Sequence, residues 1–200
     1  VYPDYTIHSC SYACESLSTI DLNAVAPSTD MPYIAAAADD NIAVLSIIQD
    51  SLFSEIRGSI TVFNSKGEVE SRIEEVPFDQ PTFFILDFCA DGNGNYYILG
   101  QSDDRTTSIL VVSAAGKRLA TYPITDNCPD IMLPAPDGIY TYDRTTDDDG
   151  NPKGIVGFVS ESQANLEEGI ELPEFFDTCT DIFISGDYIY GSDRTTLQAY

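Results

Sequence analysis

Six charged residues stand at repeated places in this chain and could carry chemistry. Three arginines lie in copies of the tetrapeptide Asp-Arg-Thr-Thr: Arg105, Arg144 and Arg194. Three aspartates lie at or near the start of apolar stretches: Asp87, Asp130 and Asp181. A guanidinium group binds anions through a fork of N–H donors, and clustered carboxylates bind hard cations such as Ca²⁺. The arginines therefore predict a basic ring for an anionic ligand, and the aspartates a divalent-cation site.

Both sets also have a structural interpretation. In each tetrapeptide the Asp could form a turn, the Arg could bind a carboxylate or carbonyl of the next unit, and the Thr could begin a strand. Each aspartate of the second set could accept hydrogen bonds from backbone amides of its own unit. Repeated placement favours the structural interpretation of both sets, because binding sites usually break a repeat.

The sequence offers few residues for histidine-dependent catalysis. His8 is the only histidine, and it stands beside Ser9 and Cys10 without a nucleophile-elbow motif or a zinc-ligand spacing. The acidic run 147–151 lacks the alternating ligands and distant Glu of an EF-hand, so we expect a solvated turn there. No catalytic residue is predicted.

The elements that must position these residues repeat with a period of roughly fifty residues, within the range of solenoids and propellers. Apolar stretches at 33–37, 84–88, 130–133 and 181–184 are each followed by Asp, Asn or Gly, which suit tight hairpins. A second apolar stretch follows each turn, and a third follows a polar connection. The predicted third strands lie at 59–63, 108–112, 155–159 and 196–200.

Fourth strands are predicted at 68–76, 117–124 and 166–172, ending at Pro77, Pro123 and Pro173. Proline belongs where an outer strand ends, because it has no amide hydrogen for a ladder. The last unit stops at its third strand, whereas residues 18–25 look like a surplus fourth strand. Repeats at about 31–76, 83–124, 128–172 and 179–200, closed by strand 18–25, predict an all-β propeller over residues 15–200 after a tail at 1–14.

Three segments carry a family resemblance: Cys128–Tyr140, Asp87–Tyr97 and Ile60–Val69. The first two resemble the Pro-x-Asp-Ile…Asp-Gly-Asn-Ile-Tyr pattern of NHL-repeat and gluconolactonase-like propellers, and the third resembles their third strand, turn and fourth strand. The resemblance covers about residues 31–200 and implies blades of four antiparallel strands. Gluconolactonase-like propellers hold a metal with Glu, Asn and Asp side chains at the channel mouth, and no Glu matches that position here.

Four blades leave three ways to close the sheet edges. The chain could close on itself as a four-bladed ring, or two copies could form an eight-bladed ring by exchanging their N-terminal strands. Alternatively, these blades could begin a longer protein. Closure within the chain is our expectation, with a homodimer through strand exchange as an alternative.

The net charge of the chain limits which kinds of partner it can bind. Nine Lys and Arg stand against 33 Asp and Glu, for a net charge of −24. Such a surface repels phosphate backbones and anionic lipid, so no nucleic-acid partner is expected. No apolar run is long enough for membrane insertion. The charge favours solubility, while cations or basic partners and a high-salt habitat remain alternatives.

The cysteines number five, so at least one has no partner within the chain. Cys10 and Cys14 could bridge each other. Cys128 and Cys179 share a repeat position, which would set them too far apart for a disulfide and predicts buried free thiols. The chain begins at Val1, which fits a mature or trimmed secreted protein, although a longer chain cut at this point would begin in the same way.

The sequence thus predicts a non-enzymatic, exported propeller in the extracellular space or the bacterial cell envelope, which binds a protein, peptide or glycan. The alternative is a metal-dependent, lactonase-like hydrolase with carboxylates at the channel mouth.

Overall fold

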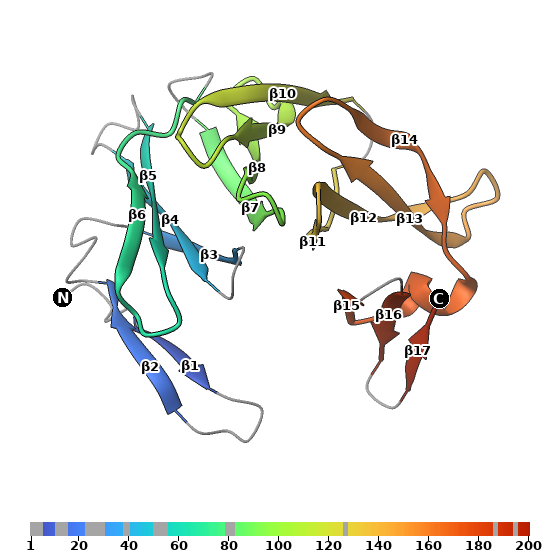
Figure 1. Ribbon diagram of the computed structural model, residues 1–200. Coiled ribbons are helices and arrows are strands. Elements are labelled where there is room, and N and C mark those ends of the chain that lie inside the picture. The colour runs from blue at the N-terminus through green and yellow to red at the C-terminus, as the bar shows by residue number, and fades with distance from the viewer. Residues whose placement is uncertain are drawn as a thin grey trace.

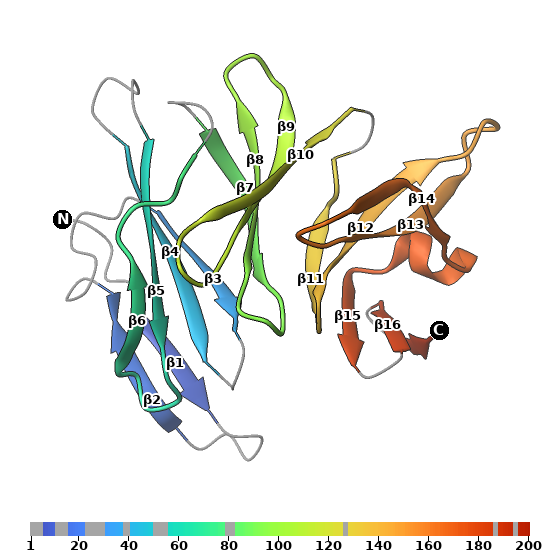
Figure 2. The same cartoon turned by 45° about the horizontal axis from the view of Figure 1, so that its top comes forward.

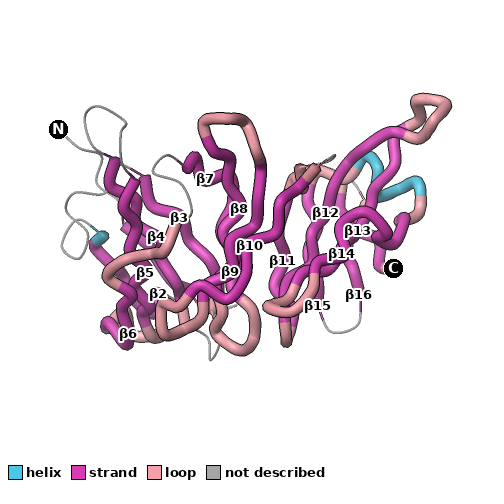
Figure 3. The backbone as a smooth tube through the Cα atoms, turned by 90° about the horizontal axis from the view of Figure 1, so that it is seen from above, coloured by secondary structure: helices cyan, strands magenta, loops and turns pink. Residues whose placement is uncertain are grey.

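The computed structural model describes residues 6–10, 16–22, 31–37, 41–49, 56–78, 83–125, 128–185, 188–193 and 196–200. Within these ranges the chain is all-β apart from short helical turns, and four antiparallel sheets take the arrangement of a four-blade β-propeller (Figure 1). The predicted fold class is confirmed. The blades follow one another in chain order along an open arc (Figure 1), and Figure 3 shows them from above as a row.

Blades 1 to 3 each have four strands, ordered along the chain from the inside of the arc to its rim. Blade 1 comprises β3 (Met31–Ala36), β4 (Ile42–Gln49), β5 (Ile56–Phe63) and β6 (Val69–Ile73). Blade 2 comprises β7 (Phe83–Ala90), β8 (Tyr96–Ser102), β9 (Thr107–Val112) and β10 (Arg118–Ile124). Blade 3 comprises β11 (Ile131–Ala135), β12 (Gly138–Thr146), β13 (Pro152–Val159) and β14 (Ala164–Glu171).

Blade 4 has three strands within the described residues: β15 (Asp181–Ser185), β16 (Tyr188–Ser192) and β17 (Leu197–Ala199). A 3₁₀ helix, η2 (Glu174–Thr178), precedes it. β1 (Thr6–Cys10) and β2 (Ser16–Asp21) form a separate two-stranded sheet at the other end of the arc. The residues interpreted as a tail therefore contain a strand.

The closing strand is a correction to the sequence-based prediction. The strand pattern predicts that residues 18–25 complete the last blade, but β2 pairs with β1, and no strand in the described ranges pairs with the outer edge of β17. Figures 1 and 2 show the β1–β2 hairpin and blade 4 on opposite sides of the opening of the arc. Ring closure depends on long-range geometry, which a strand pattern does not contain.

The core consists of packed boundaries between blades. One cluster joins Leu45 and Ile60 of blade 1 to Ile98 and Leu110 of blade 2, and similar clusters lie between blades 2 and 3 and between blades 3 and 4. The middle strands are buried on both faces, so β8 and β9 are apolar nearly throughout. The outer strands are more exposed: β6 is mostly exposed and carries Glu, Ser and Arg, and β10 alternates between exposed and partly buried positions.

Four hairpin turns share one conformation, which explains the regular glycines. The turns begin at Asn64, Asp91, Ser113 and Asp147, and their fourth residues are Gly67, Gly94, Gly116 and Gly150. Each glycine has φ between 78° and 84°, in the left-handed region that glycine adopts most easily. Each glycine N–H donates to the carbonyl of the first residue over 2.8–3.2 Å. The side chain of the first residue accepts the N–H of the fifth.

Candidate functional site

Asp87 links two neighbouring blades. Its Oδ2 accepts the backbone N–H of Met132 on β11 over 2.8 Å, and its Oδ1 accepts the N–H of Phe88 over 2.8 Å. Burial raises the pKa of this carboxyl, while the two backbone donors oppose the shift. The bond to Met132 crosses from blade 2 to blade 3, so Asp87 acts as a structural link between them.

Asp130 and Arg144 form a pair inside blade 3. Arg144 Nε lies 3.0 Å from Asp130 Oδ2, and the Arg144 backbone N–H donates to the same oxygen over 3.2 Å. Arg144 Nη1 also reaches the Cys179 carbonyl before blade 4, at 3.5 Å. Asp130 raises the pKa of Arg144 by accepting its hydrogen bond. The pair is half-exposed. The contact with the Cys179 carbonyl is of the kind predicted for the Arg of the tetrapeptide, but Asp143 and Thr145 lie inside β12, rather than in a turn and at the start of a strand.

The three predicted metal ligands do not form one site. Asp181 is exposed, and its Oδ2 accepts a hydrogen bond from Thr180 Oγ1 over 3.2 Å. Across the described part of the chain, no three His, Cys, Asp or Glu side chains come together in a way that could hold a metal ion. Asp87 and Asp130 instead satisfy a backbone amide and a guanidinium group.

The three Asp-Arg-Thr-Thr copies are not structurally equivalent. Arg105 lies in the β8–β9 turn, where it has φ 67° and takes the place that glycine takes in the four similar turns. Arg144 lies inside strand β12, paired with Gly154. The third copy spans the β16–β17 connection, and Arg194 lies outside the described residues. Arg105 and Arg144 thus have different environments, which argues against a ring made by repeat symmetry.

The described residues include two buried thiols, Cys89 and Cys179. Burial, with help from Asp87, raises the pKa of Cys89 to about 12, so its thiol stays protonated. Cys179 is a buried thiol, as predicted, beside Phe176 of η2. Cys128 is a thiol but exposed, contrary to the expectation from its repeat position. Cys14 and the side chains of His8 and Cys10 lie outside the described residues.

A mostly apolar cavity of about 830 Å³ opens where the inner strands end. Its walls come from all four blades, and the inner-strand ends contribute Ala37, Ala90, Ala135 and Ile184. Further lining residues of blades 3 and 4 are aromatic: Tyr140, Tyr188 and Tyr200. Tyr188 and Tyr200 are 55% and 52% exposed, so apolar surface remains open at the cavity mouth.

A hydrogen bond and a close backbone approach keep the shape of this cavity. The Gly92 N–H donates to the Ala135 carbonyl over 2.9 Å, which joins the β7–β8 turn to the inner strand of the next blade. A Cβ at Gly92 would lie 2.7 Å from the Pro136 carbonyl oxygen, so only glycine fits. Asp91 also lines the cavity, but its carboxylate accepts four hydrogen bonds from residues 93, 95 and 97. The cavity wall is therefore preformed and largely apolar.

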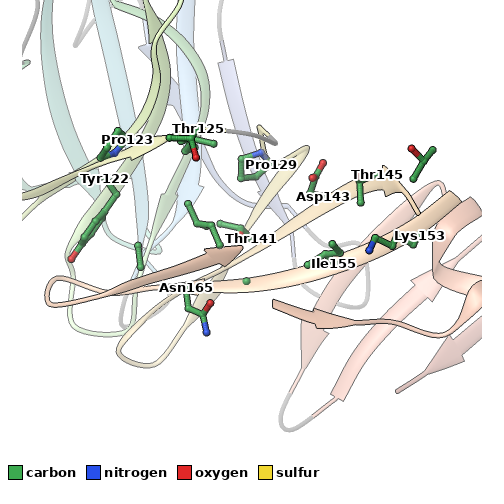
Figure 4. Close-up of a pocket in the computed structure, with 15 residues that line it drawn as sticks. Tyr122, Pro123, Thr125, Pro129, Thr141, Asp143, Thr145, Lys153, Ile155 and Asn165 are labelled. Atoms are coloured by element: carbon green, nitrogen blue, oxygen red, sulfur yellow. The ribbon is translucent and has the colours of Figure 1, made fainter. Parts of the chain in front are cut away.

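A second, more polar pocket of about 720 Å³ lies between the outer strand of blade 2 and blade 3. Figure 4 shows two parts of its wall. One part contains Tyr122 of β10 and Thr125, which directly follows β10, and the other contains Thr141 and Asp143 of β12. Burial, and then the nearby Asp130, raises the pKa of Asp143. Lys153 lines the same pocket, and its Nζ lies 3.9 Å from Glu171 Oε2. This pocket offers separate polar groups but no close acid–base pair among the contacts described.

Comparison with known proteins supports the architecture. No family model matches the chain, and no curated protein matches its sequence. A mutant of the apocarotenoid oxygenase from Synechocystis is similar over 92% of this chain and 49% of its own, with 12% identity and a TM-score of 0.52. This chain thus spans about half the length of that protein. At such identity the likeness shows the fold alone.

Two further solved structures match less closely. The acylaminoacyl peptidase from Pyrococcus horikoshii has a TM-score of 0.45 and 11% identity, over 87% of this chain and 33% of its own. The β-propeller domain of the trilobed protease from Pyrococcus furiosus has a TM-score of 0.38 and 10% identity, over 86% of this chain and 57% of its own.

The cavity was not predicted from the sequence, although some of its residues were noted. The abundance of tyrosine on second strands suggested either packing between blades or an aromatic rim. Tyr97 and Tyr142 are fully buried, whereas Tyr140 and Tyr188 line the cavity. Strand alternation could separate inward from outward tyrosines, but only the packing of blades shows which ones meet at the cavity mouth.

Proposed function

We propose that this chain is a non-enzymatic binding propeller whose central cavity holds an apolar segment of a protein or peptide. The single observation that carries this proposal is the cavity at the inner-strand ends, which is lined by alanine, proline, isoleucine and tyrosine from four blades. Ligand sites are typically preformed, mostly apolar hollows of this size with few polar groups. Tyrosine supplies a large contact area at low entropic cost, which suits recognition of side chains.

The chemistry of the lining favours a peptide over a glycan. A glycan needs several free donors and acceptors, yet the charged group at the cavity, Asp91, already accepts four hydrogen bonds. The net charge of −24 adds long-range attraction for a basic partner. We therefore expect a ligand that combines apolar side chains with Lys or Arg. An extracellular or cell-envelope location, and membership of the NHL-like propellers, belong to the same proposal.

A neutral, apolar dye tests the cavity without knowledge of the natural ligand. Nile red should gain fluorescence on binding, and replacement of Tyr188 or Tyr200 by alanine should weaken its binding at least fivefold. The matched control is Phe84→Ala, because Phe84 is 53% exposed on β7 but does not line the cavity. Equal dye binding by all four proteins would refute the assignment of the cavity.

A peptide array then tests the ligand class. Arrayed 12-residue peptides that contain both aromatic and basic residues should bind the protein more strongly than acidic or polar peptides. Binding should fall when salt is raised, because the steering component is screened. A preference for glycans on a parallel array, with no peptide binding, would contradict the proposed partner.

The hydrolase alternative needs a bound divalent cation, and the described carboxylates give it no cluster. Titration calorimetry with Ca²⁺, Mg²⁺ and Zn²⁺ separates the two functions. Binding accompanied by a rise in melting temperature would favour the hydrolase, because a ligand that binds the folded state stabilises it.

A further inference from the structure

The polar pocket between blades 2 and 3 has a row of three polar side chains on strand β12. Thr141, Asp143 and Thr145 alternate along this strand, and all three line the pocket (Figure 4). Alternate residues of a strand point to the same face, at intervals of about 7 Å. The row therefore presents a carboxylate between two hydroxyl groups.

The row departs from the repeat at Thr141. Leu110 of blade 2 and Gly157 of blade 3 both lie two residues before the end of the third strand, and their cross-strand partners are Ile98 and Thr141. Ile98 and Leu110 are buried in the core between blades 1 and 2. In blade 3, a Cβ at Gly157 would lie 2.7 Å from Thr141 Oγ1. The glycine thus keeps side-chain atoms away from a hydroxyl that replaces an apolar pair.

The next position on the same face departs from the repeat as well. In blade 2 this position is Gly100, where a Cβ would overlap the ring of Phe83. The centroid of that ring lies 5.7 Å from the centroid of Phe78, and both rings pack in the core cluster of blades 1 and 2. In blade 3 the position is Asp143, and none of the described lining residues is a phenylalanine. Aromatic rings fill the first boundary, whereas the second holds a pocket of about 720 Å³.

Asp143 is half-buried and has no counter-charge among the described residues. Burial raises the pKa of its carboxyl, and Asp130 adds to the rise. Within the described part of the chain, no hydrogen bond or ion pair reaches its oxygens. The nearby cations pair elsewhere: Arg144 with Asp130, and Lys153 with Glu171. A cation that enters the pocket would therefore gain a charge-assisted hydrogen bond without breaking an existing one.

A primary ammonium group matches this row. It carries one positive charge and three N–H donors, and the row offers a carboxylate flanked by two hydroxyl oxygens. A metal ion would need several clustered ligands, which the described acidic, His and Cys side chains do not provide. Ile124, Pro129 and Ile155 also line the pocket and can hold the hydrocarbon part of a ligand. The net charge of −24 attracts cations to the surface.

We propose that this pocket binds a small primary amine with an apolar body. The ammonium group donates to the row of Thr141, Asp143 and Thr145, and the body lies against Ile124 and Ile155. The pocket shares no described lining residue with the central cavity. The proposal is therefore independent of the ligand proposed for that cavity.

A titration with 2-phenylethylamine tests the pocket, followed by amide chemical shifts in nuclear magnetic resonance. In about 0.15 M NaCl, which screens non-specific attraction, the amides of residues 141–145 and 155 should shift together and saturate. The matched probe is 2-phenylethanol, which has the same shape but no charge. We expect it to bind roughly tenfold more weakly or not at all, because it cannot pair with the carboxylate.

Asp143→Asn removes the charge and keeps the shape of the side chain. It should weaken amine binding by roughly tenfold or more, with an unchanged melting temperature, because the carboxylate accepts no described hydrogen bond. Asp137→Asn is the matched control, since Asp137 is exposed on the same blade and does not line the pocket. Its binding should equal that of the wild type. Thr145→Val, which removes one acceptor, should weaken binding by about threefold.

Three results would overturn the proposal. One is no shift of these amides at about 10 mM amine, where even a weak site would fill. Another is equal binding of the amine and the alcohol, which would leave no role for the charge. The third is the same affinity for the amine in Asp143→Asn and Asp137→Asn, because attraction by net charge alone would then explain the binding.

Discussion

Replacement of Asp91 by alanine should destabilise the protein far more than the same replacement at Asp147. Both aspartates begin the same five-residue turn, and each accepts two backbone N–H groups and one asparagine Nδ2 group. The two aspartates differ in how deeply their side chains are buried. Asp91 is 2% exposed and also accepts the hydroxyl of Tyr97, which is fully buried, over 3.1 Å. Asp147 lies at the surface, where water can replace a lost acceptor.

The magnitude follows from the groups left without partners. A buried donor that loses its acceptor costs about 1–3 kcal/mol, and the Tyr97 hydroxyl is such a donor. The turn amides lose charge-assisted bonds, each of which contributes roughly 1.5–3 kcal/mol before water replaces part of it. We expect Asp91→Ala to lower the free energy of unfolding by about 3 kcal/mol, or about 6–12 °C in melting temperature for a chain of this size.

Thermal and urea unfolding followed by circular dichroism would measure this difference. Asp147→Ala is the matched control, since it removes the same turn bonds without the buried hydroxyl. Tyr97→Phe should reproduce part of the loss, because it removes the donor and leaves the turn intact. Equal destabilisation by Asp91→Ala and Asp147→Ala would refute the reasoning, as burial of Asp91 would then contribute nothing.

Three further predictions concern other features. Arg105→Gly should raise the free energy of unfolding by about 0.5–1 kcal/mol, because an L-residue at φ 67° is strained. Urea unfolding would measure this change, and a lower free energy of unfolding would show that the Arg105 side chain makes a compensating contact. Tyr142→Phe should cost about 1–2 kcal/mol, since it removes the 2.7 Å bond from the buried hydroxyl to the Phe176 carbonyl, whereas Tyr140→Phe in the same melting assay should cost little. The pKa of Asp87 is raised, so its contribution to stability is present at low pH and is lost as pH rises through the folded pKa. The stability of Asp87→Asn relative to wild type should therefore increase between about pH 4 and pH 7 in urea titrations, and a parallel pH profile for the two proteins would contradict this.

Local sequence patterns predicted most of the strands. Apolar stretches separated by Asp, Asn and Gly gave the first three strands of every blade within a few residues, because turn chemistry is local. The outer strands were also found, since one exposed face makes them polar and alternating. Pro123, predicted to end a strand, lies inside β10 opposite Ser108, where an outer edge tolerates it.

The candidate site was less predictable. Asp87 and Asp130 were recognised as groups with a role, but their partners Met132 and Arg144 become visible only when strands are paired and blades are packed. Identical tetrapeptides took different conformations, because Arg105 lies in a turn and Arg144 lies inside a longer strand. Sequence identity does not fix the hairpin register, which depends on where the ladder ends.

The sequence by itself determined the all-β class, the order of the strands and the positions of the tight turns, since these depend on side-chain alternation and on residues that accept positive φ. The tertiary structure decided how the blades meet, which tyrosines line a cavity and whether β2 reaches β17. Those outcomes depend on the angle between packed sheets, summed over four blades. No short stretch of sequence determines the total angle between the first and the last blade, so the open arc is visible only in the tertiary structure.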